Sequence, residues 1–175
     1  IVKAKNSNYS NQLYSLDEYS TSNNWHRSHG NNFSTRFSNF NNINNENAKN
    51  LKLAWVYNPE DEKNFINNVQ ANPIFYNGNI LLPNSQNQIV SIDGLTGKQN
   101  WKFDVDKGIA AKRGMIIYDS DKYNNEPRIF FVNNRNRLFS LNANTGKPIS
   151  KFGKNGEVEI GLTPIPPVIY KNQLI

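Results

Sequence analysis

The sequence predicts an all-β protein, an incomplete β-propeller made of four-stranded antiparallel blades. Three observations support this prediction. The chain repeats itself, because Thr145-Gly146-Lys147 follows Thr96-Gly97-Lys98 at an offset of 49 positions within otherwise similar surroundings. Each copy contains short β-branched and aromatic runs separated by turn residues, which is typical of strands. Strand-rich repeats of about 40 to 50 residues usually form propeller blades, and two copies with the start of a third cannot close a ring.

The first copy, residues 72–106, is expected to form one complete blade. Its four strands are predicted at residues 73–76, 79–82, 88–93 and 100–103. Asn77-Gly78 lies between the first two strands and favours a tight hairpin, because both residues tolerate positive φ angles. Gly97 is expected to be left-handed in the turn between the last two strands.

The second copy, residues 113–152, is predicted to form the next blade. Its strands are expected at residues 114–118, 128–132, 137–141 and 149–152, followed by a further short strand at 157–160. A third copy is expected to start within residues 163–175, where Pro167-Val168-Ile169-Tyr170 resembles Pro73-Ile74-Phe75-Tyr76. Because an apolar run reaches Ile175, we expect the chain to be a piece of a larger protein.

Two segments precede the repeats. Residues 1–24 form a polar lead-in, rich in Ser, Asn and Tyr, that shows no sustained periodicity. Residues 25–71 form an opening segment, in which an aromatic-studded loop over 25–38 precedes a helical turn over 44–51, with Asn44 or Asn45 as its cap. The aromatic and β-branched run at 53–57 predicts a strand.

The composition excludes several classes of function. The formal net charge is +6, but the Lys and Arg residues are scattered singly, whereas nucleic-acid binding needs positive charge concentrated on one face. The absence of cysteine excludes disulfides, iron–sulfur clusters and Cys-ligated zinc. No apolar run approaches the about 18 residues needed to span a membrane, and no signal peptide is visible, although either could lie upstream of Ile1. The high Asn content is interpreted as a coding bias rather than a mechanism.

No metal site is predicted in this chain. His26 and His29 form a His-x-x-His pair, but no third ligand lies nearby in the sequence. Asp119, Asp121 and Glu126 lack the mid-loop Gly and the final Glu of a calcium loop, so we interpret them as a solvated hairpin insertion. The chain also lacks Gly-x-Ser-x-Gly, phosphate-loop and GxGxxG motifs, which leaves hydrolase and nucleotide-binding functions without support.

Three stretches resemble a known family. The pattern Ser91-x-Asp93-x-x-Thr96-Gly97-Lys98-x-x-Trp101 resembles the tryptophan-docking repeat of the pyrroloquinoline quinone (PQQ) propellers, in which the indole of one blade packs against its neighbour. The second copy has Ser150 in the Trp position, so this contact is expected to be missing or replaced there. Residues 25–57 are similar to the opening segment of the quinoprotein dehydrogenases, and residues 128–156 look most like the membrane glucose-dehydrogenase type.

This resemblance implies a function. It suggests part of an eight-bladed propeller that binds PQQ and calcium and oxidises a sugar, polyol or alcohol by hydride transfer to the quinone, while an Asp accepts the hydroxyl proton. Electrons would pass to ubiquinone or a cytochrome. The expected location is the periplasm, with membrane attachment through a segment outside this chain. The base Asp and the calcium ligands would lie beyond Ile175, so the resemblance implies no catalytic or metal residue here, and we expect the fragment alone to be inactive.

The resemblance also implies two cofactor-binding residues. Arg113, followed by Gly114, falls where the family places an Arg beside the quinone oxygens, at which negative charge develops on reduction. Gln70 falls where several relatives have a Glu near the cofactor, and its amide can donate and accept hydrogen bonds but cannot act as a base. The alternatives are an Arg113 paired with Asp104 or Asp106 at a blade edge, and a Gln70 that is only a polar residue before a strand.

The chain departs from the family pattern at one place, and the sequence is also compatible with a second function. Alcohol-oxidising members of the family often carry two adjacent cysteines shortly before the Arg, whereas this chain has Lys107-Gly108 there, which favours a sugar or polyol substrate. Non-catalytic scaffolds share the same repeat. The alternative function is therefore a PQQ-like propeller that serves as an assembly scaffold or binding platform.

Overall fold

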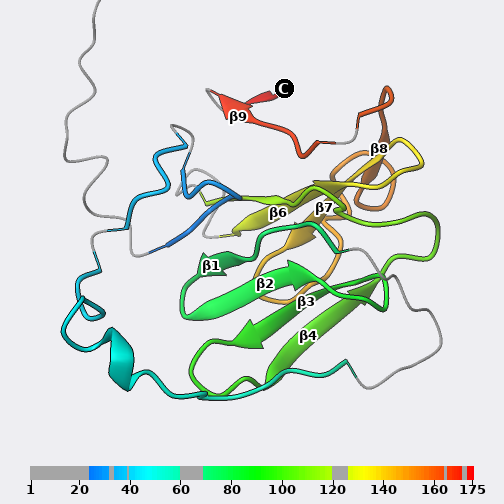
Figure 1. Ribbon diagram of the computed structural model, residues 1–175. Helices are drawn as coiled ribbons and strands as arrows, with labels where there is room; N and C mark the ends of the chain where they lie inside the picture. Colours follow the sequence, from blue (N-terminus) through cyan, green and yellow to red (C-terminus); the bar gives the residue numbers. More distant parts are fainter. Residues whose placement is uncertain are drawn as a thin grey trace, which may run out of the picture.

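The computed structural model describes residues 24–31, 34–38, 40–59, 69–119, 126–163, 165–170 and 173–175. It contains two four-stranded antiparallel sheets and a two-stranded hairpin, which follow one another as in a stack (Figure 1). The helical content of the described residues is one 3-10 turn, η1 (Ala48–Asn50). The predicted incomplete β-propeller is therefore confirmed. Apart from Asn24, the predicted polar lead-in lies outside the described residues.

The first sheet has the four predicted strands in sequence order. They are β1 (Ile74–Tyr76), β2 (Asn79–Pro83), β3 (Gln88–Asp93) and β4 (Gln99–Asp104), and each pairs antiparallel with the next. The turn between β1 and β2 has positive φ at both Asn77 (46°) and Gly78 (78°), as the Asn-Gly pair predicts. Every residue of β3 except its last is buried, because other elements cover both faces of the strand.

The second sheet differs from the prediction in its last strand. Its strands are β5 (Ile116–Tyr118), β6 (Arg128–Val132), β7 (Arg137–Asn142) and β8 (Glu157–Glu159). The strand predicted at 149–152 is absent, since the chain leaves β7 after a short contact in which Ile149 N donates to Ser140 O. Residues 150–156 then form turns before Phe139 pairs with Glu157. This insertion removes Ser150 from the position that Trp101 occupies in the first sheet.

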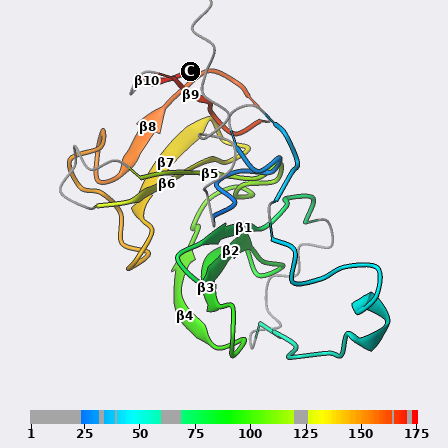
Figure 2. The same cartoon turned by 90° about the vertical axis from the view of Figure 1, so that its left-hand side faces the viewer.

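The core lies between the two sheets. Ile74, Leu81 and Ile89 of the first sheet form one buried cluster with Ile129 and Leu141 of the second. A group of phenylalanines extends the cluster outward: the rings of Phe131 and Phe139 stack 4.9 Å apart, and Phe103 meets both of them edge-on. The hairpin of β9 (Ile169–Tyr170) and β10 (Gln173–Leu174) packs on the other side of the second sheet through a separate cluster (Figure 2).

The predicted docking of a tryptophan between blades is present. The Trp101 indole from β4 lies on Gly146 in the last turn of the second sheet, and its Nε1 donates to Ala143 O at 3.2 Å. Gly146 has φ +68°, and a Cβ there would overlap the indole ring. The contact therefore requires glycine for two reasons, conformation and space. It connects the outermost strand of one sheet to the next sheet.

Asparagine side chains fix the segment that connects the two sheets, a role that the composition did not indicate. Asn87 donates from Nδ2 to the carbonyls of Val105 and Gly108, both at 2.8 Å, and accepts from Ala110 N at 3.0 Å. Asn133 in the second sheet donates to Lys107 O at 2.8 Å. Residues 105–110 connect β4 to β5. These bonds therefore fix where β5, the innermost strand of the second sheet, begins.

Replacing Asn87 by alanine is expected to lower the free energy of unfolding by about 1.5 kcal/mol more than replacing Asn136. Both residues occupy the left-handed region, at φ 61° and 59°, so the conformational cost is shared. The Asn87 side chain makes three hydrogen bonds, whereas no described contact involves the side chain of Asn136. Urea unfolding of the two variants measures the difference. Equal losses would show that the bonds to residues 105–110 contribute nothing.

The two turns that follow β3 and β7 are built alike. The Asp93 carboxylate accepts from the Thr96 hydroxyl and from the N–H groups of Leu95 and Thr96, and these bonds, led by that from the Thr96 hydroxyl, hold the pKa of Asp93 below its usual range. Asn142 makes the equivalent backbone contacts in the second sheet, with Asn144 N and Thr145 N. A charged side chain is therefore not required to close this turn.

The strand predicted at 53–57 is not part of a sheet in the described residues. Residues 51–59 are free of helix and of ladder pairing, although Trp55 packs on Gly97 in the last turn of the first sheet. The helical turn predicted before this run is confirmed as η1, but the cap position is Asn47 and not Asn44 or Asn45. The Asn44 side chain instead closes the preceding turn by accepting from Glu46 N and Asn47 N. No helix in the described part of the chain is long and apolar enough to cross a membrane.

Candidate functional site

The innermost strands of the two sheets, β1 and β5, are linked by contacts at both of their ends. At their far ends, the Tyr76 hydroxyl donates to Asp119 Oδ2 at 2.5 Å. At their near ends, Ser28 connects the two strands: its carbonyl accepts from Asn72 Nδ2 at 3.4 Å, and its hydroxyl lies against Gly114. The segments that precede the two strands therefore lie at the same end of the stack, which we call the near end.

The opening segment is attached to both innermost strands. Trp25 exchanges two backbone hydrogen bonds with Phe75 of β1, and His26 O accepts from Ile117 N of β5 at 2.9 Å. Residues 25–30 thus lie between the first and second sheets at their inner edge (Figure 2). Because this short segment bonds to both sheets, it sets the spacing between the two near ends.

Both predicted cofactor-binding residues lie at this near end. Gln70 is exposed and comes four residues before β1, and Arg113 is exposed and comes three residues before β5. No ion pair joins Arg113 to Asp104 or Asp106 within the described residues, and Gln88 Nε2 donates to Asp104 at 2.8 Å instead. The two residues thus precede the first strands of adjacent sheets at positions that differ by one residue, and both side chains are exposed.

Ser28 is a residue of this end that the sequence did not point to. Gly114 has φ +110°, which disfavours any other residue, and a Cβ added to it would lie 2.7 Å from Ser28 Oγ. The hydroxyl therefore occupies the space beside a bare backbone, and Arg113 precedes that contact directly. The only signal in the sequence was the glycine after Arg113; a serine in a polar loop carries none.

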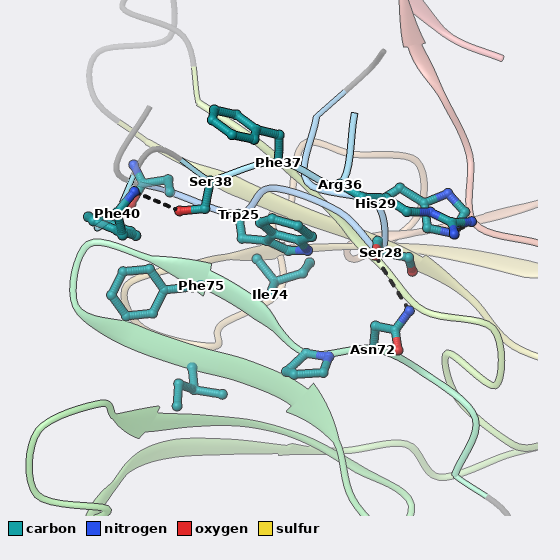
Figure 3. Close-up of a pocket in the computed structure, with 13 residues that line it drawn as sticks. Trp25, Ser28, His29, Arg36, Phe37, Ser38, Phe40, Asn72, Ile74 and Phe75 are labelled. Carbon is teal, nitrogen blue, oxygen red and sulfur yellow. Dashed lines mark hydrogen bonds between the residues drawn. The ribbon is translucent and has the colours of Figure 1, made fainter. Parts of the chain in front are cut away.

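A cavity of about 800 Å³ lies beside this end (Figure 3). Its apolar wall consists of Trp25, Ile74 and Phe75 with neighbouring aromatic side chains, and its polar side includes Asn72 and Ser28. The two cationic or basic groups of the cavity, Arg36 and His29, lie together, with Nη2 of Arg36 3.4 Å from Nε2 of His29. Neither Gln70 nor Arg113 lines this cavity, so the predicted pair and the hollow are neighbouring features rather than one site.

At the opposite end, His26, Tyr76 and Asp119 form a titratable cluster. Burial raises the pKa of Tyr76, and its hydrogen bond to Asp119 raises it further. The ring of His26 lies 6.1 Å from that of Tyr76, and its buried Nε2 has no hydrogen-bond partner among the described residues. Burial lowers the pKa of His26, and the nearby Asp119 charge opposes this effect. His26 is thus part of the packing between the sheets rather than a loop residue.

Replacing His26 by glutamine is expected to reduce the loss of stability in mild acid. The folded pKa of His26 lies below its unfolded value of about 6.5, so the unfolded chain binds the proton more readily. Stability contributed by the neutral ring is complete above the unfolded pKa and is lost as the pH falls towards the folded one. Urea unfolding between pH 7.5 and 5 measures the slope. A His29→Gln control that flattens the slope equally would contradict this assignment.

The described residues contain no group of three or more His, Asp or Glu side chains arranged to hold a metal ion. The near end offers hydrogen-bond donors and positive charge instead, from Gln70, Asn72, Lys112 and Arg113. Groups of this kind bind anionic, oxygen-rich ligands. This set of four residues carries positive charge and amide groups and includes no carboxylate.

Comparison with known proteins identifies the family to which the chain belongs. A PQQ family model described as "Glucose/ethanol/alcohol dehydrogenase, beta-propeller domain" matches residues 25–171. Quinoprotein glucose dehydrogenase A of Acinetobacter calcoaceticus is 31% identical over 135 residues, covering 63% of this chain and 17% of that protein. Quinoprotein glucose dehydrogenase of Gluconobacter oxydans (strain 621H) is 30% identical over 132 residues, covering 63% of this chain and 16% of that protein.

A solved structure supports the fold. The quinohemoprotein alcohol dehydrogenase from Comamonas testosteroni superposes with a TM-score of 0.62 at 24% identity, over 86% of this chain and 22% of that one. At this identity the likeness supports the β-propeller architecture alone. The chain spans about a sixth of the length of the two curated relatives.

Proposed function

Because the chain belongs to the PQQ family of glucose, ethanol and alcohol dehydrogenase β-propeller domains, we propose that it is part of a PQQ-dependent dehydrogenase that oxidises a sugar or polyol. The observation that carries the proposal is the common near end of β1 and β5, where Gln70 and Arg113 precede adjacent innermost strands with exposed side chains. Both relatives with curated names are glucose dehydrogenases, which favours a sugar over a simple alcohol.

The near end suits the cofactor in its chemistry. PQQ is a planar ortho-quinone with three carboxylates, so its site requires cations and N–H donors around a flat space. Arg113 and Lys112 supply positive charge, and Gln70 and Asn72 supply amides. Gly114 is buried with Ser28 Oγ in the space beside it, so this contact would fix the backbone next to Arg113 and leave the ligand to the exposed side chains.

These residues would act by binding and by electrostatics. Bound PQQ supplies the oxidising group that accepts a hydride from the substrate's alcohol carbon. Arg113 would hold a quinone oxygen and stabilise the negative charge that develops there, a role suited to a guanidinium because it keeps its charge at every physiological pH. Gln70 would donate from its amide without taking up a proton. Ser28 would fix the backbone ahead of β5 and so aim Arg113.

The remaining components lie outside the described residues. A calcium ion, its ligands and the carboxylate that accepts the substrate's proton would come from other blades. The electron acceptor would be ubiquinone or a cytochrome. We place the whole protein in the periplasm, attached to the membrane through a segment that is not part of this chain. The fragment alone would then bind the cofactor weakly and lack activity.

Reconstitution tests the proposal. A form of this protein extended to the length of its relatives would be incubated with PQQ and calcium, and reduction of an artificial dye would be followed with glucose, polyols and simple alcohols as substrates. Dye reduction with glucose or a polyol, dependent on PQQ, is the expected result. If the protein shows no activity and retains no quinone, the proposal is overturned. That result would favour the alternative, a non-catalytic propeller that serves as a scaffold.

A further inference from the structure

We propose that Asn77, in the turn between β1 and β2, is a site of spontaneous covalent modification, at which the side-chain amide is lost and aspartate and isoaspartate form. The structure selects this asparagine over Asn155, which also precedes a glycine. The product weakens the contact between the two sheets at the far ends of β1 and β5. The inference concerns this chain alone and does not depend on the chemistry proposed above.

The reaction at an Asn-Gly pair needs an accessible backbone nitrogen. The nitrogen of the glycine attacks the asparagine Cγ, the Cγ–Nδ2 bond breaks, and ammonia leaves with the proton that the nitrogen loses. Water then opens the five-membered succinimide ring. Opening at the side-chain carbonyl gives aspartate, and opening at the backbone carbonyl gives isoaspartate. A glycine favours the attack because it has no Cβ to obstruct its nitrogen.

The turn at Asn77 and Gly78 gives access to the reactive conformation. Both residues have positive φ, and Tyr76 pairs with Asn79 across them, as in a two-residue type I′ hairpin. Rotation of the single peptide group between Asn77 and Gly78 converts type I′ into type II′, which keeps φ of Asn77 positive and brings its ψ to about −120°. At that ψ the Gly78 nitrogen faces the Asn77 side chain, as ring closure requires. Gly78 tolerates the accompanying change in its φ.

Few contacts oppose this rotation at Asn77. Asn77 and Gly78 are both exposed, and no atom lies within 4 Å of a Cβ built on Gly78. Among the described residues Gly78 N donates no hydrogen bond, and the Asn77 carbonyl accepts only from the Asn79 side chain, at 3.0 Å. The bonds of Asn77 N and Gly78 O belong to the neighbouring peptide groups, which do not rotate. The nucleophile is therefore accessible in the folded chain.

Asn155 and Gly156 form a turn of the same kind in which the nucleophile is bonded. Their φ angles are +56° and +92°, and Lys154 exchanges two backbone hydrogen bonds with Glu157 across them. Gly156 is buried, however, and its nitrogen donates to Phe152 O at 3.0 Å. The same rotation here breaks a buried backbone hydrogen bond. The two Asn-Gly pairs thus share their sequence and turn geometry and differ in the accessibility of the attacking nitrogen.

The product changes the titratable cluster at the far end. Burial raises the pKa of Tyr76 and its bond to Asp119 raises it further, whereas a hydrogen bond from the Asn77 side chain lowers it. The Asn77 amide thus lies beside the hydroxyl that connects β1 to Asp119. A carboxylate at this place removes a donor and adds a second negative charge close to Asp119. Isoaspartate also lengthens the backbone of a turn that has room for two residues.

Peptide mapping by mass spectrometry tests the inference. This chain would be incubated in mildly alkaline buffer, and the gain of about 1 Da at each asparagine would be followed with time. In the folded chain Asn77 is expected to react at least about 10-fold faster than Asn155, the ratio that one buried hydrogen bond maintains. In urea, which removes that bond, the two rates should become similar. Equal rates in the folded chain, or a ratio that persists in urea, would overturn the proposal.

Asn77→Gln is the matched control for the chemistry. It keeps a side-chain amide, but attack would have to close a six-membered ring, so no gain in mass is expected at position 77. A gain as fast as in the unchanged chain would overturn the mechanism. The modified chain, separated by its extra negative charge, should show amide hydrogen exchange in β1 at least about 10-fold faster, with β4 unchanged. Unchanged exchange in β1 would overturn the stated effect on the far end.

Discussion

Replacement of Gly146 by alanine is expected to lower the free energy of unfolding by about 4 kcal/mol. The residue has φ +68°, which costs a residue with a side chain about 1 kcal/mol. The added Cβ would also overlap the Trp101 indole, and displacing a packed ring costs a further 1 to 3 kcal/mol, about the range for an overpacked core. The hydrogen bond from Trp101 Nε1 to Ala143 O would be lost with it. Urea unfolding monitored by tryptophan fluorescence measures the change.

Gly78→Ala is the matched control. Gly78 has a similar φ of +78°, but no atom lies within 4 Å of a Cβ added there. This variant is expected to lose only about 1 kcal/mol, the conformational part of the cost. If both variants lost the same amount, the docked indole would contribute nothing to the contact between the sheets. The combined tryptophan emission maximum, to which Trp101 contributes, should shift to longer wavelength in Gly146→Ala and stay unchanged in Gly78→Ala.

Arg113→Gln is expected to lower kcat of the reconstituted dehydrogenase by about 100-fold. The variant keeps a side chain that can donate a hydrogen bond but removes the charge that would stabilise the reduced quinone oxygens. Losing one such electrostatic contact typically costs about 100-fold to 1,000-fold in rate. Arg113 is exposed and makes no ion pair within the described residues, so its removal should leave the fold intact. Dye reduction with glucose gives kcat, and quenching of tryptophan fluorescence gives the affinity for PQQ.

Lys112→Gln is the control for charge alone. Lys112 is exposed and adjacent to Arg113, so both variants lower the net charge of the same segment by one. A loss of activity confined to Arg113→Gln supports the specific role. Equal losses in both variants would instead indicate a general attraction for an anionic cofactor. Unchanged kcat and unchanged PQQ affinity in Arg113→Gln would remove Arg113 from the site while leaving the family membership intact.

The first blade was predictable because each of its signals is local. The Asn77-Gly78 turn, the short apolar and β-branched runs of β2 and β3 and the glycine of the last turn all act over a few residues, and the structure follows them. The docking of Trp101 was also predictable, since a repeat with Trp and Gly at fixed spacing places one over the other in the next copy. Most of the strands of the second sheet follow for the same reason.

Two local predictions failed where pairing depends on distant parts of the chain. Residues 149–152 have strand-like composition, but a turn-rich insertion lets Glu157–Glu159 take the fourth position beside β7 instead. Residues 53–57 also have strand-like composition, but no described strand pairs with them. Propensity describes one segment, whereas a strand exists only when a partner is available.

The candidate site was also only partly predictable from the sequence. The sequence alone pointed to Gln70 and Arg113 through a resemblance and placed each before an innermost strand. Only the tertiary structure brought the two starts to one end of the stack, through a Ser28 that bonds to the segment before β1 and fills the space at Gly114. It also revealed the half-buried His26 beside Tyr76, because burial depends on what packs on a residue and not on its neighbours in sequence.

By itself, the sequence determined the repeat, the number and order of strands in the first blade and the residue types that connect one blade to the next, because turns, alternation and spacing are properties of short segments. The tertiary structure alone decided which segment completes the second blade, which side chains meet at the near end of the stack and that residues 53–57 pair with no described strand. Those features depend on contacts between residues many positions apart, and such contacts form only when whole sheets stack.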